Sequence, residues 1–451
     1  MLPELHTSIP GPQSLADAAT LRRYESRNVT YTDAEYPIFW QRAEGTNVWD
    51  VDGNRFLDWT SAFGVAGLGH TNPAVRDALI TQAGSLLHAM GDVHPTPLKA
   101  ELCARLSALT FERWGGGRGK TILGNSGFEA VEAALKTSLL HSGKPGVIAF
   151  HGAYHGLGYG ALEVGGTPYF REPFRSQLRD FATFLPFPHC LHCPQGVTEA
   201  FRLEGRDFPN CSTYCLEKIG AQIEETIATR EIGAILLEPI QGRGGEIVPP
   251  LDFLRLLRTI CDTHKILLVL DEIYTGFNRT GALFACEHFG IVPDLICLGK
   301  GLTSGFPLSA CVGRSDIMDA WPASNGEALH TSTFLGNPLG CAMALASLEQ
   351  HAKPEVAVHV RERGKRLKAA LREIASPHIV DVRGVGLLVG VELDLDGATV
   401  NGLVKQALTA GLILLQSGPE GNVLSFTPPF AISDEEIAWT VEQLRHSLAA
   451  V

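Results

Sequence analysis

The middle of the chain alternates short, uniformly apolar runs with longer amphipathic stretches. The apolar runs are "GAILLEPI" (233–240), "KILLVLDEIY" (265–274) and "DLICLGKG" (294–301), and between them "LDFLRLLRTICDTH" (251–264) repeats its apolar residues at helical spacing. Strands of a parallel sheet are apolar throughout because helices cover both faces. The pattern therefore predicts an α/β fold built on a mostly parallel sheet.

Each of these apolar runs ends near an ionisable residue: Glu238, Asp271 and Lys300. Their separations are close to the ~30 residues of one strand-helix-strand unit. Ligands of open parallel sheets bind beyond the carboxyl ends of the strands, so we expect these three side chains in one crevice. The next apolar stretch, 306–318, follows a turn too short for a helical crossover, which predicts an antiparallel strand.

The pattern changes near residue 340, where a long helical stretch is followed by separated strands and a final amphipathic helix. A chain of 451 residues is also too long for one small core. We predict an N-terminal segment (1–70) that contributes to a small domain, a large domain (71–340) and a C-terminal small domain (341–451).

Composition narrows the possible partners. The net charge of −12, without a dense Lys/Arg run, argues against binding nucleic acid. The N-terminus lacks the pattern of a secretory signal, and no segment reaches the ~18 consecutive apolar residues of a membrane span. We therefore expect a cytoplasmic protein that does not enter membranes.

The segment "GNSGFEAVEAALK" (124–136) predicts the start of a helix. Ser126 and Glu129 have the spacing of a capping box, and Gly127 leaves the backbone N–H groups of the first turn unobstructed. Such a helix end can bind a phosphate, although a purely structural cap is the commoner meaning of this pattern.

Six segments occur in the order and spacing of the class III aminotransferases, which this chain resembles from about residue 37 to residue 440. They are "GNSGFEAVEAALK", "FHGAYHG" (150–156), "LLEPIQGRGG" (236–245), "LVLDEIYTGFNRTG" (268–281), "CLGKGLTSGFPLSA" (297–310) and "TSTFLGNPLGCAMA" (331–344). The resemblance implies a fold type I enzyme that uses pyridoxal 5'-phosphate. It also implies a large domain with a seven-stranded, mostly parallel sheet and a smaller α+β domain.

The resemblance gives catalytic roles to Lys300 and Asp271. Lys300 would carry the cofactor as a Schiff base (an aldimine), and burial favours the neutral amine that this bond needs. Once substrate displaces it, the freed amine can move a proton between substrate and cofactor. Asp271 would pair with the pyridine nitrogen and keep it protonated.

The other cofactor contacts implied by the resemblance surround the phosphate and the ring: Ser126, Gly127, Phe128, Tyr154, Glu238, Gln241, Ile273 and Thr333. The first three would bind the phosphate, Tyr154 and Ile273 would lie on opposite faces of the ring, and Gln241 would approach the ring hydroxyl. Glu238 would lie near the ring-binding aspartate. Thr333 would reach the phosphate of a neighbouring subunit, which implies a homodimer with shared active sites.

The chain departs from the family on the substrate side. Ser425 stands where many members have a carboxylate-binding arginine, Arg243 stands where its glutamate partner is usual, and Leu157 replaces an arginine of some subfamilies. We expect Arg243 to bind a substrate carboxylate, a solvated arginine at the rim being the alternative. Phe63, from the family-like segment 47–73, is the second candidate substrate residue.

An insertion near 188–215 contains four closely spaced cysteines, Cys190, Cys193, Cys211 and Cys215. The spacing is compatible with a structural zinc site, with disulfides or with free thiols. No catalytic step needs a metal, so none is assigned to the active site.

The expected function is transfer of an amino group from an amino acid or amine donor to a keto acid, ketone or aldehyde acceptor. The alternative is an amino acid racemase or epimerase on the same scaffold. That reaction would need Lys300 and one further proton acceptor on the opposite face of the ring.

Overall fold

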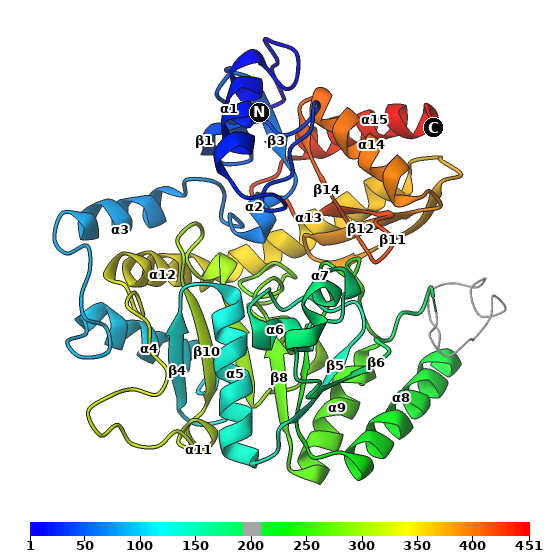
Figure 1. The fold of residues 1–451 in the computed structure, drawn as a ribbon. Coiled ribbons are helices and arrows are strands. Elements are labelled where there is room, and N and C mark those ends of the chain that lie inside the picture. The colour runs from blue at the N-terminus through cyan, green and yellow to red at the C-terminus, as the bar shows by residue number, and fades with distance from the viewer. Residues whose placement is uncertain (193–208) are drawn as a thin grey trace.

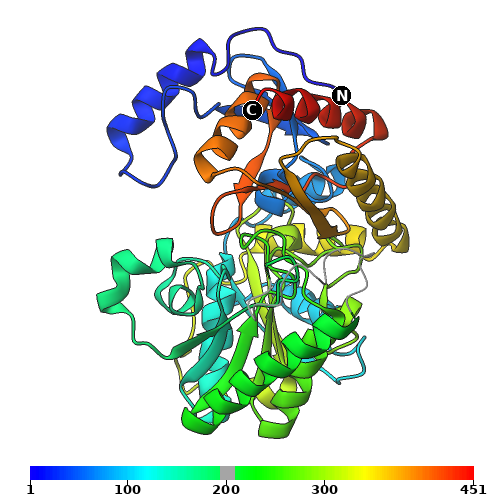
Figure 2. The same cartoon turned by 90° about the vertical axis from the view of Figure 1, so that its right-hand side faces the viewer.

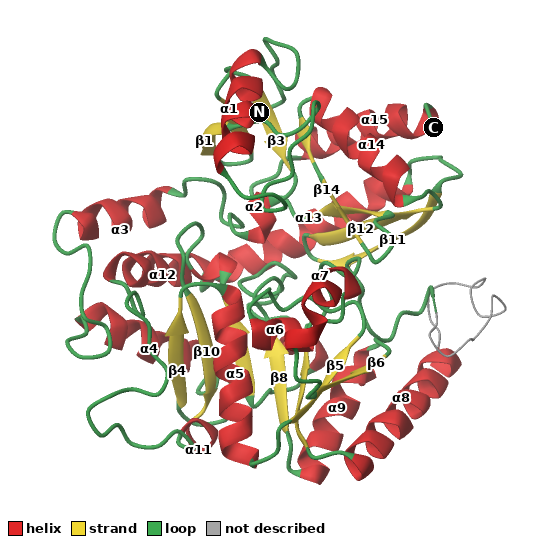
Figure 3. Ribbon diagram, in the orientation of Figure 1, coloured by secondary structure: helices red, strands yellow, loops and turns green. Residues whose placement is uncertain are grey.

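The computed structural model describes the backbone of residues 1–192 and 209–451, with the side chains of 209–214 left out. A seven-stranded sheet with its helices forms the lower part in Figure 1, and a smaller part that carries both termini lies above it. Figure 3 shows the same two parts coloured by helix and strand.

The large sheet has the strand order β4-β10-β9-β8-β7-β5-β6. Its strands are β4 (Gly119–Gly124), β5 (Gly146–Phe150), β6 (Ala182–Leu185), β7 (Ile232–Leu237), β8 (Leu267–Asp271), β9 (Leu295–Leu298) and β10 (Ser309–Arg314). Strands β6, β5, β7, β8 and β9 pair in parallel, whereas β10 is antiparallel to both β9 and β4. The predicted α/β fold, with its mostly parallel seven-stranded sheet and one reversed strand, is confirmed.

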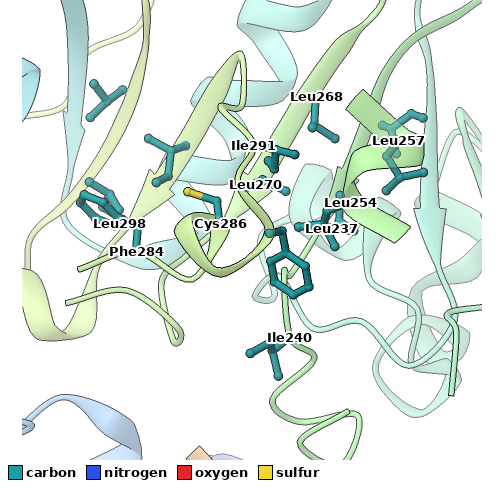
Figure 4. Packing of buried hydrophobic residues seen from close by; sticks show 14 of the residues in the cluster. Leu237, Ile240, Leu254, Leu257, Leu268, Leu270, Phe284, Cys286, Ile291 and Leu298 are labelled. Atoms are coloured by element: carbon teal, nitrogen blue, oxygen red, sulfur yellow. The ribbon is translucent and has the colours of Figure 1, made fainter. Parts of the chain in front are cut away.

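Helices cover both faces of this sheet, as Figure 2 shows from the side. The longer ones are α4 (Pro97–Leu109), α5 (Gly127–Ser142), α8 (Pro209–Thr229) and α9 (Leu251–His264). Alternate residues of a strand point to opposite faces. Leu236 of β7 accordingly packs in the cluster with α5, and its neighbour Leu237 in the cluster with α9, where Leu254 and Leu257 meet Leu268 (Figure 4).

The smaller part contains two four-stranded sheets. One has the order β1-β2-β3-β13 and the other β11-β12-β15-β14. The strands are β1 (Trp40–Glu44), β2 (Asn47–Asp50), β3 (Arg55–Asp58), β11 (Ile379–Val385), β12 (Leu388–Leu393), β13 (Leu412–Ile413), β14 (Leu415–Ser417) and β15 (Val423–Phe426), with helices α1 (Pro12–Tyr24), α13 (Pro354–Arg372), α14 (Gly397–Thr409) and α15 (Asp434–Ala449).

N-terminal and C-terminal segments share this smaller core. β13 pairs in parallel with β3, and the buried ring of Trp59 lies 5.5 Å from that of Phe426. In contrast, α12 (Pro338–His351) packs against α4 and α3 (Pro73–Ala83), beside the large sheet. The exact domain limits at residues 70 and 340 stay predictions.

Short helical segments complete the described chain: α2 (Ser61–Gly64), α6 (Tyr159–Val164), α7 (Pro168–Arg171), α10 (Cys286–Phe289) and α11 (Ser315–Met318), with 3-10 turns at Glu172–Gln177 and Lys300–Leu302. Among the residues described, no helix combines the length and the apolar character that crossing a membrane requires.

The cysteine-bearing insertion is only partly described. Cys193 lies outside the described residues, and the side chain of Cys211 is among those left out. In the remainder of the chain no three His, Cys, Asp or Glu side chains are placed to hold a metal ion together. The question of zinc, disulfide or free thiols at the four cysteines therefore stays open.

Candidate active site

Three neighbouring strands of the large sheet carry the predicted ionisable residues to one place. Glu238 follows the end of β7, Asp271 ends β8, and Lys300 begins the turn after β9. All three line a cavity of about 560 Å³ between the large sheet and the β14–β15 hairpin. The sequence-based expectation of a shared crevice agrees with this placement.

Lys300 lies in a 3-10 turn with a left-handed backbone, φ 43°. Left-handed conformations of residues other than glycine are strained and cluster at functional sites. Its Nζ lies 4.1 Å from the ring centre of Tyr274. Burial lowers the pKa of Lys300 from 10.5 to about 8, while the negative charges of Asp271 and Glu238 act in the opposite direction. About a tenth to a fifth of this amine is thus neutral between pH 7 and pH 7.4, far more than for a solvated lysine.

Two glycines hold the Tyr274 ring beneath the lysine. A Cβ atom added at Gly64 would lie 2.4 Å from the ring, and one added at Gly242 would lie 2.3 Å from it. The Tyr274 hydroxyl is 3.1 Å from Thr427 Oγ1. The ring therefore has little freedom to move away from Lys300.

Asp271 is 4% exposed and has two neighbouring polar groups. Its Oδ2 is 2.8 Å from Nδ1 of the buried His155, and its Oδ1 accepts a hydrogen bond from the Ile273 N–H at 3.0 Å. These two contacts orient the carboxylate, and Asp271 also lines the cavity. Such an arrangement suits pairing with a protonated ring nitrogen.

Glu238 joins two loops at the cavity wall. Its carboxylate accepts hydrogen bonds from the backbone N–H groups of Tyr154 (2.8 Å) and Gly242 (2.7 Å). Burial raises the pKa of Glu238, and the negative charge of Asp271 adds to this effect. Gln241 lies outside the cavity lining and donates a hydrogen bond to the His151 carbonyl at 2.9 Å.

The first turn of α5 forms one end of the cavity through Gly127 and Phe128. Backbone N–H groups in the first turn of a helix have no acceptor inside it, which favours an anion. Ser126 precedes them as the N-cap, and its own N–H donates to Glu129 at 2.7 Å. The predicted capping box is confirmed, and Ser126 itself does not line the cavity.

Aromatic side chains and one arginine shape the outer part of the cavity. The Tyr154 ring lies 5.4 Å from that of Phe170, and Phe63 reaches the lining from the left-handed turn Ser61–Gly64. Arg243 is exposed, and its guanidinium lies 5.5 Å from the Phe170 ring. No ion pair joins Arg243 to any residue that the structure describes.

The cavity brings together most, but not all, of the candidate residues. Those that line it are Phe63, Gly127, Phe128, Tyr154, Glu238, Arg243, Asp271, Ile273 and Lys300. Ser126, Gln241 and Thr333 lie outside the lining, and Thr333 is exposed on the surface. Within one chain, therefore, Thr333 does not contribute to this cavity.

The sequence analysis missed three cavity residues whose side chains can form hydrogen bonds or carry charge: His155, Glu246 and Tyr274. Of these, His155 contacts Asp271. His155 directly follows Tyr154 in "FHGAYHG", and Tyr274 follows Ile273, so both stand beside residues that were selected. Glu246 follows the glycine pair after Arg243, and its position gave no comparable signal.

Comparison with known proteins agrees with the motifs. The family model described as "Aminotransferase class-III" matches residues 29–448. The chain belongs to the class III aminotransferases. It is therefore a transferase that depends on pyridoxal 5'-phosphate, as the motifs implied.

Individual relatives cover nearly the whole chain. A 4-aminobutyrate aminotransferase from Mycobacterium leprae is 35% identical, over 96% of this chain and 95% of its own. A 5-aminovalerate aminotransferase from Pseudomonas aeruginosa is 37% identical, over 89% of this chain and 91% of its own. The solved structure of a PLP-bound amine transaminase from an uncultivated Pseudomonas species superposes with a TM-score of 0.84 at 28% identity, covering 95% of this chain and 98% of that one.

The cavity of this class III aminotransferase fits the cofactor. Tyr154 and Ile273 both line it and offer apolar surfaces for a flat ring, and Gly127 packs so closely that a Cβ there would lie 3.0 Å from Ile273 Cδ1. The helix end suits a phosphate, the Asp271 carboxylate suits a ring cation, and the Lys300 amine suits an aldehyde.

Proposed function

We propose that Lys300 holds pyridoxal 5'-phosphate in this cavity and acts as the proton carrier of the transamination, while Asp271 pairs with the ring nitrogen of the cofactor. The observation that carries this assignment is the convergence of a partly neutral amine and a buried, oriented carboxylate in one cavity. When bound, the cofactor supplies an aldehyde that bonds amines and a ring that accepts electrons.

The residues around the cofactor would then bind, orient and transfer protons. Gly127 and Phe128 would hold the phosphate through backbone N–H groups, with Ser126 fixing the helix end. Asp271 would keep the ring nitrogen protonated because its charge favours the cation. Lys300, kept over the Tyr274 ring, would move a proton to and from the substrate carbon.

Substrate binding is proposed to involve Phe63 and Arg243. Arg243 lines the cavity and has no ion-pair partner among the described residues, so its guanidinium is available for a carboxylate. The acceptor or donor would thus include a carboxylate-bearing compound. Phe63, exposed at the cavity edge, would cover the apolar part of a substrate.

A homodimer with shared active sites forms part of this proposal. Leu87, Met90, Val93 and Phe334 are all exposed, and the Phe334 ring lies 5.1 Å from His88, so two loops together present an apolar surface. Thr333 is exposed in the same region. A second subunit that covers this surface would bring Thr333 to its partner's phosphate.

A cytoplasmic location is proposed on the low cysteine content. The chain has ten cysteines among 451 residues, far fewer than a scaffold held by disulfides. Most of them are therefore expected to be reduced, as in a reducing compartment. Fractionation of the native host, with detection of the protein in the cytoplasmic fraction, tests this location.

The reaction is tested by mixing the protein, loaded with pyridoxal 5'-phosphate, with one amino donor and no acceptor. Transamination converts the bound cofactor to its amine form, so the visible band of the aldehyde form disappears. Because no acceptor is present, each active site forms one molecule of keto acid or aldehyde product. Racemisation, the alternative, exchanges the substrate proton for solvent deuterium but returns the aldehyde form. Persistence of the band with every amino donor would refute the proposed function.

A further inference from the structure

A buried carboxylate on the cavity wall has no role in the chemistry above. Glu246 is 1% exposed and lines the cavity together with Ser417 and Ser425. The Ser417 hydroxyl donates to its Oε2 at 2.7 Å, and the Ser425 hydroxyl donates to its Oε1 at 2.5 Å. Ser425 stands where many members of the family have an arginine, so at this place the cavity carries a negative rather than a positive group.

No cationic side chain among the described residues forms an ion pair with Glu246. Arg383, whose positive charge acts on Glu246, donates instead to the Gly245 carbonyl at 2.7 Å and to Glu392 at 2.5 Å. A carboxylate has about four acceptor positions, and the two serines use one on each oxygen. Glu246 therefore retains acceptor positions for a ligand in the cavity.

The electrostatics of the wall favour a cation as this ligand. Burial raises the pKa of Glu246 to about 7, although the two serine hydrogen bonds and Arg383 lower it, and the negative charge of Glu238 raises it further. An ammonium beside Glu246 would favour its ionised form and remove the cost of the lone buried charge. A second carboxylate at this place would instead be repelled.

We propose that Glu246, Ser417 and Ser425 form a subsite for an ammonium group at the far end of the amino donor, so that the enzyme accepts diamines. One amine of the donor would react at Lys300 while the other is held by Glu246. This inference rests on the proposed function. Arg243, at the exposed edge, would serve the carboxylate of the other substrate, which occupies the cavity in the second half-reaction.

The test compares three donors with the same five-carbon chain: cadaverine, which ends in an ammonium, pentylamine, which ends in a methyl group, and 5-aminovalerate, which ends in a carboxylate. We expect kcat/KM for cadaverine to exceed that for pentylamine by about tenfold to about a hundredfold, the size of a hydrogen bond between charged groups. In Glu246→Gln this preference should disappear, because the KM for cadaverine rises until its kcat/KM approaches that for pentylamine.

Glu272→Gln is the matched control. Glu272 is also fully buried, burial likewise raises its pKa to about 7, and it lies outside the cavity, bonded to Thr275 and two backbone N–H groups. Its substitution should leave the ratio of the cadaverine and pentylamine kcat/KM values unchanged. A general loss of stability would lower both values in either variant, and the ratio would stay the same.

The outcomes separate this inference from the proposed function. Wild-type protein that reacts equally well with cadaverine and pentylamine, or better with 5-aminovalerate than with cadaverine, overturns the ammonium subsite while leaving transamination intact. A Glu246→Gln variant that keeps the cadaverine preference overturns it as well. If an amino acid converts the bound cofactor but none of the three test amines does, the subsite fails while transamination stands. If no amino donor of any kind converts the bound cofactor, the proposed function fails, and the subsite fails with it.

Discussion

Nδ1 of His155 lies 2.8 Å from Oδ2 of Asp271, and both side chains are buried where β5 and β8 end. The two residues are 116 positions apart in the chain. With a proton on Nδ1, the imidazole donates to the carboxylate and fixes its orientation toward the cavity. We infer that His155 is a positioning residue, which would act on the cofactor through Asp271.

His155→Ala should weaken cofactor binding because Asp271 loses an oriented donor. The loss of one charge-assisted hydrogen bond predicts an apparent Kd for pyridoxal 5'-phosphate about tenfold to about a hundredfold higher. Titration of the apo-protein followed by visible absorbance measures this Kd. His155→Asn, whose side-chain amide can also donate, should recover part of the affinity. Wild-type affinity in a folded His155→Ala protein would show that Asp271 needs no such partner.

The lowered pKa of Lys300 predicts how fast the apo-protein recombines with the cofactor at different pH values. Only the neutral amine reacts. With a pKa of about 8 instead of 10.5, half of the amine is neutral at pH 8 and about nine-tenths of it at pH 9. The rate should therefore rise about tenfold per pH unit below pH 8 and level off above pH 8.

Stopped-flow absorbance measures this rate, and butylamine in the same buffers corrects for ionisation of the cofactor itself. A rate that keeps rising to about pH 10 would mean that Lys300 has the ordinary pKa of a solvated lysine.

Arg243→Ala tests the proposed carboxylate site. The variant should raise the KM for carboxylate-bearing substrates by about tenfold or more, as expected for loss of a bidentate ion pair, with little change in kcat. Arg243→Lys keeps the positive charge but lacks the planar guanidinium, so its KM for these substrates should lie between the values of the wild type and of Arg243→Ala. Amine donors without a carboxylate serve as the internal control. Equal KM values for every carboxylate substrate in wild type and variant would make Arg243 a solvated residue of the rim.

Thr333 offers a test of shared active sites through hybrid dimers. Lys300→Ala subunits lack the reacting amine, and Thr333→Ala subunits should bind the cofactor weakly. If Thr333 serves the partner's site, a mixed dimer contains one site with both wild-type residues, since Lys300 then comes from one subunit and Thr333 from the other.

Refolding the two variants together should therefore restore activity at limiting cofactor, to about half of the wild-type value per hybrid dimer, by counting sites. Homodimers of each variant, treated in the same way, are the controls. Mixed dimers with no more activity than the controls would place Thr333 in the site of its own chain or outside both sites.

The sheet and the shared placement of three ionisable residues could be predicted because their signals are local. Uniformly apolar runs mark buried parallel strands, and the geometry of such a sheet places Glu238, Asp271 and Lys300 at the same edge. The antiparallel return of β10 followed in the same way from the short turn before it. These inferences needed only the order of residues along neighbouring segments.

The substrate side of the cavity could not be predicted because it depends on how the smaller part packs on the large sheet. Glu246 and Ser425 form a hydrogen bond across 179 positions of sequence. Similarly, Gly64 and Gly242 enclose Tyr274 from two different parts of the chain. No periodicity along the sequence carries information about such contacts.

The backbone of Asn278, in the segment "LVLDEIYTGFNRTG" (268–281), accounts for the residue found there. It has φ 63°, a left-handed conformation that glycine adopts freely and that asparagine tolerates. Its side-chain amide also donates to the His351 carbonyl at 2.8 Å. Asparagine therefore fits this left-handed conformation and adds a buried hydrogen bond.

The central claim is that Lys300 is the residue which bonds the cofactor. It is tested most directly by reducing the protein loaded with pyridoxal 5'-phosphate with borohydride and mapping its peptides by mass spectrometry. Reduction makes the bond between cofactor and lysine permanent. The account predicts the added phosphopyridoxyl mass on the peptide that contains Lys300, and on no peptide after Lys300→Ala. The added mass on a different lysine of the wild-type protein would contradict it.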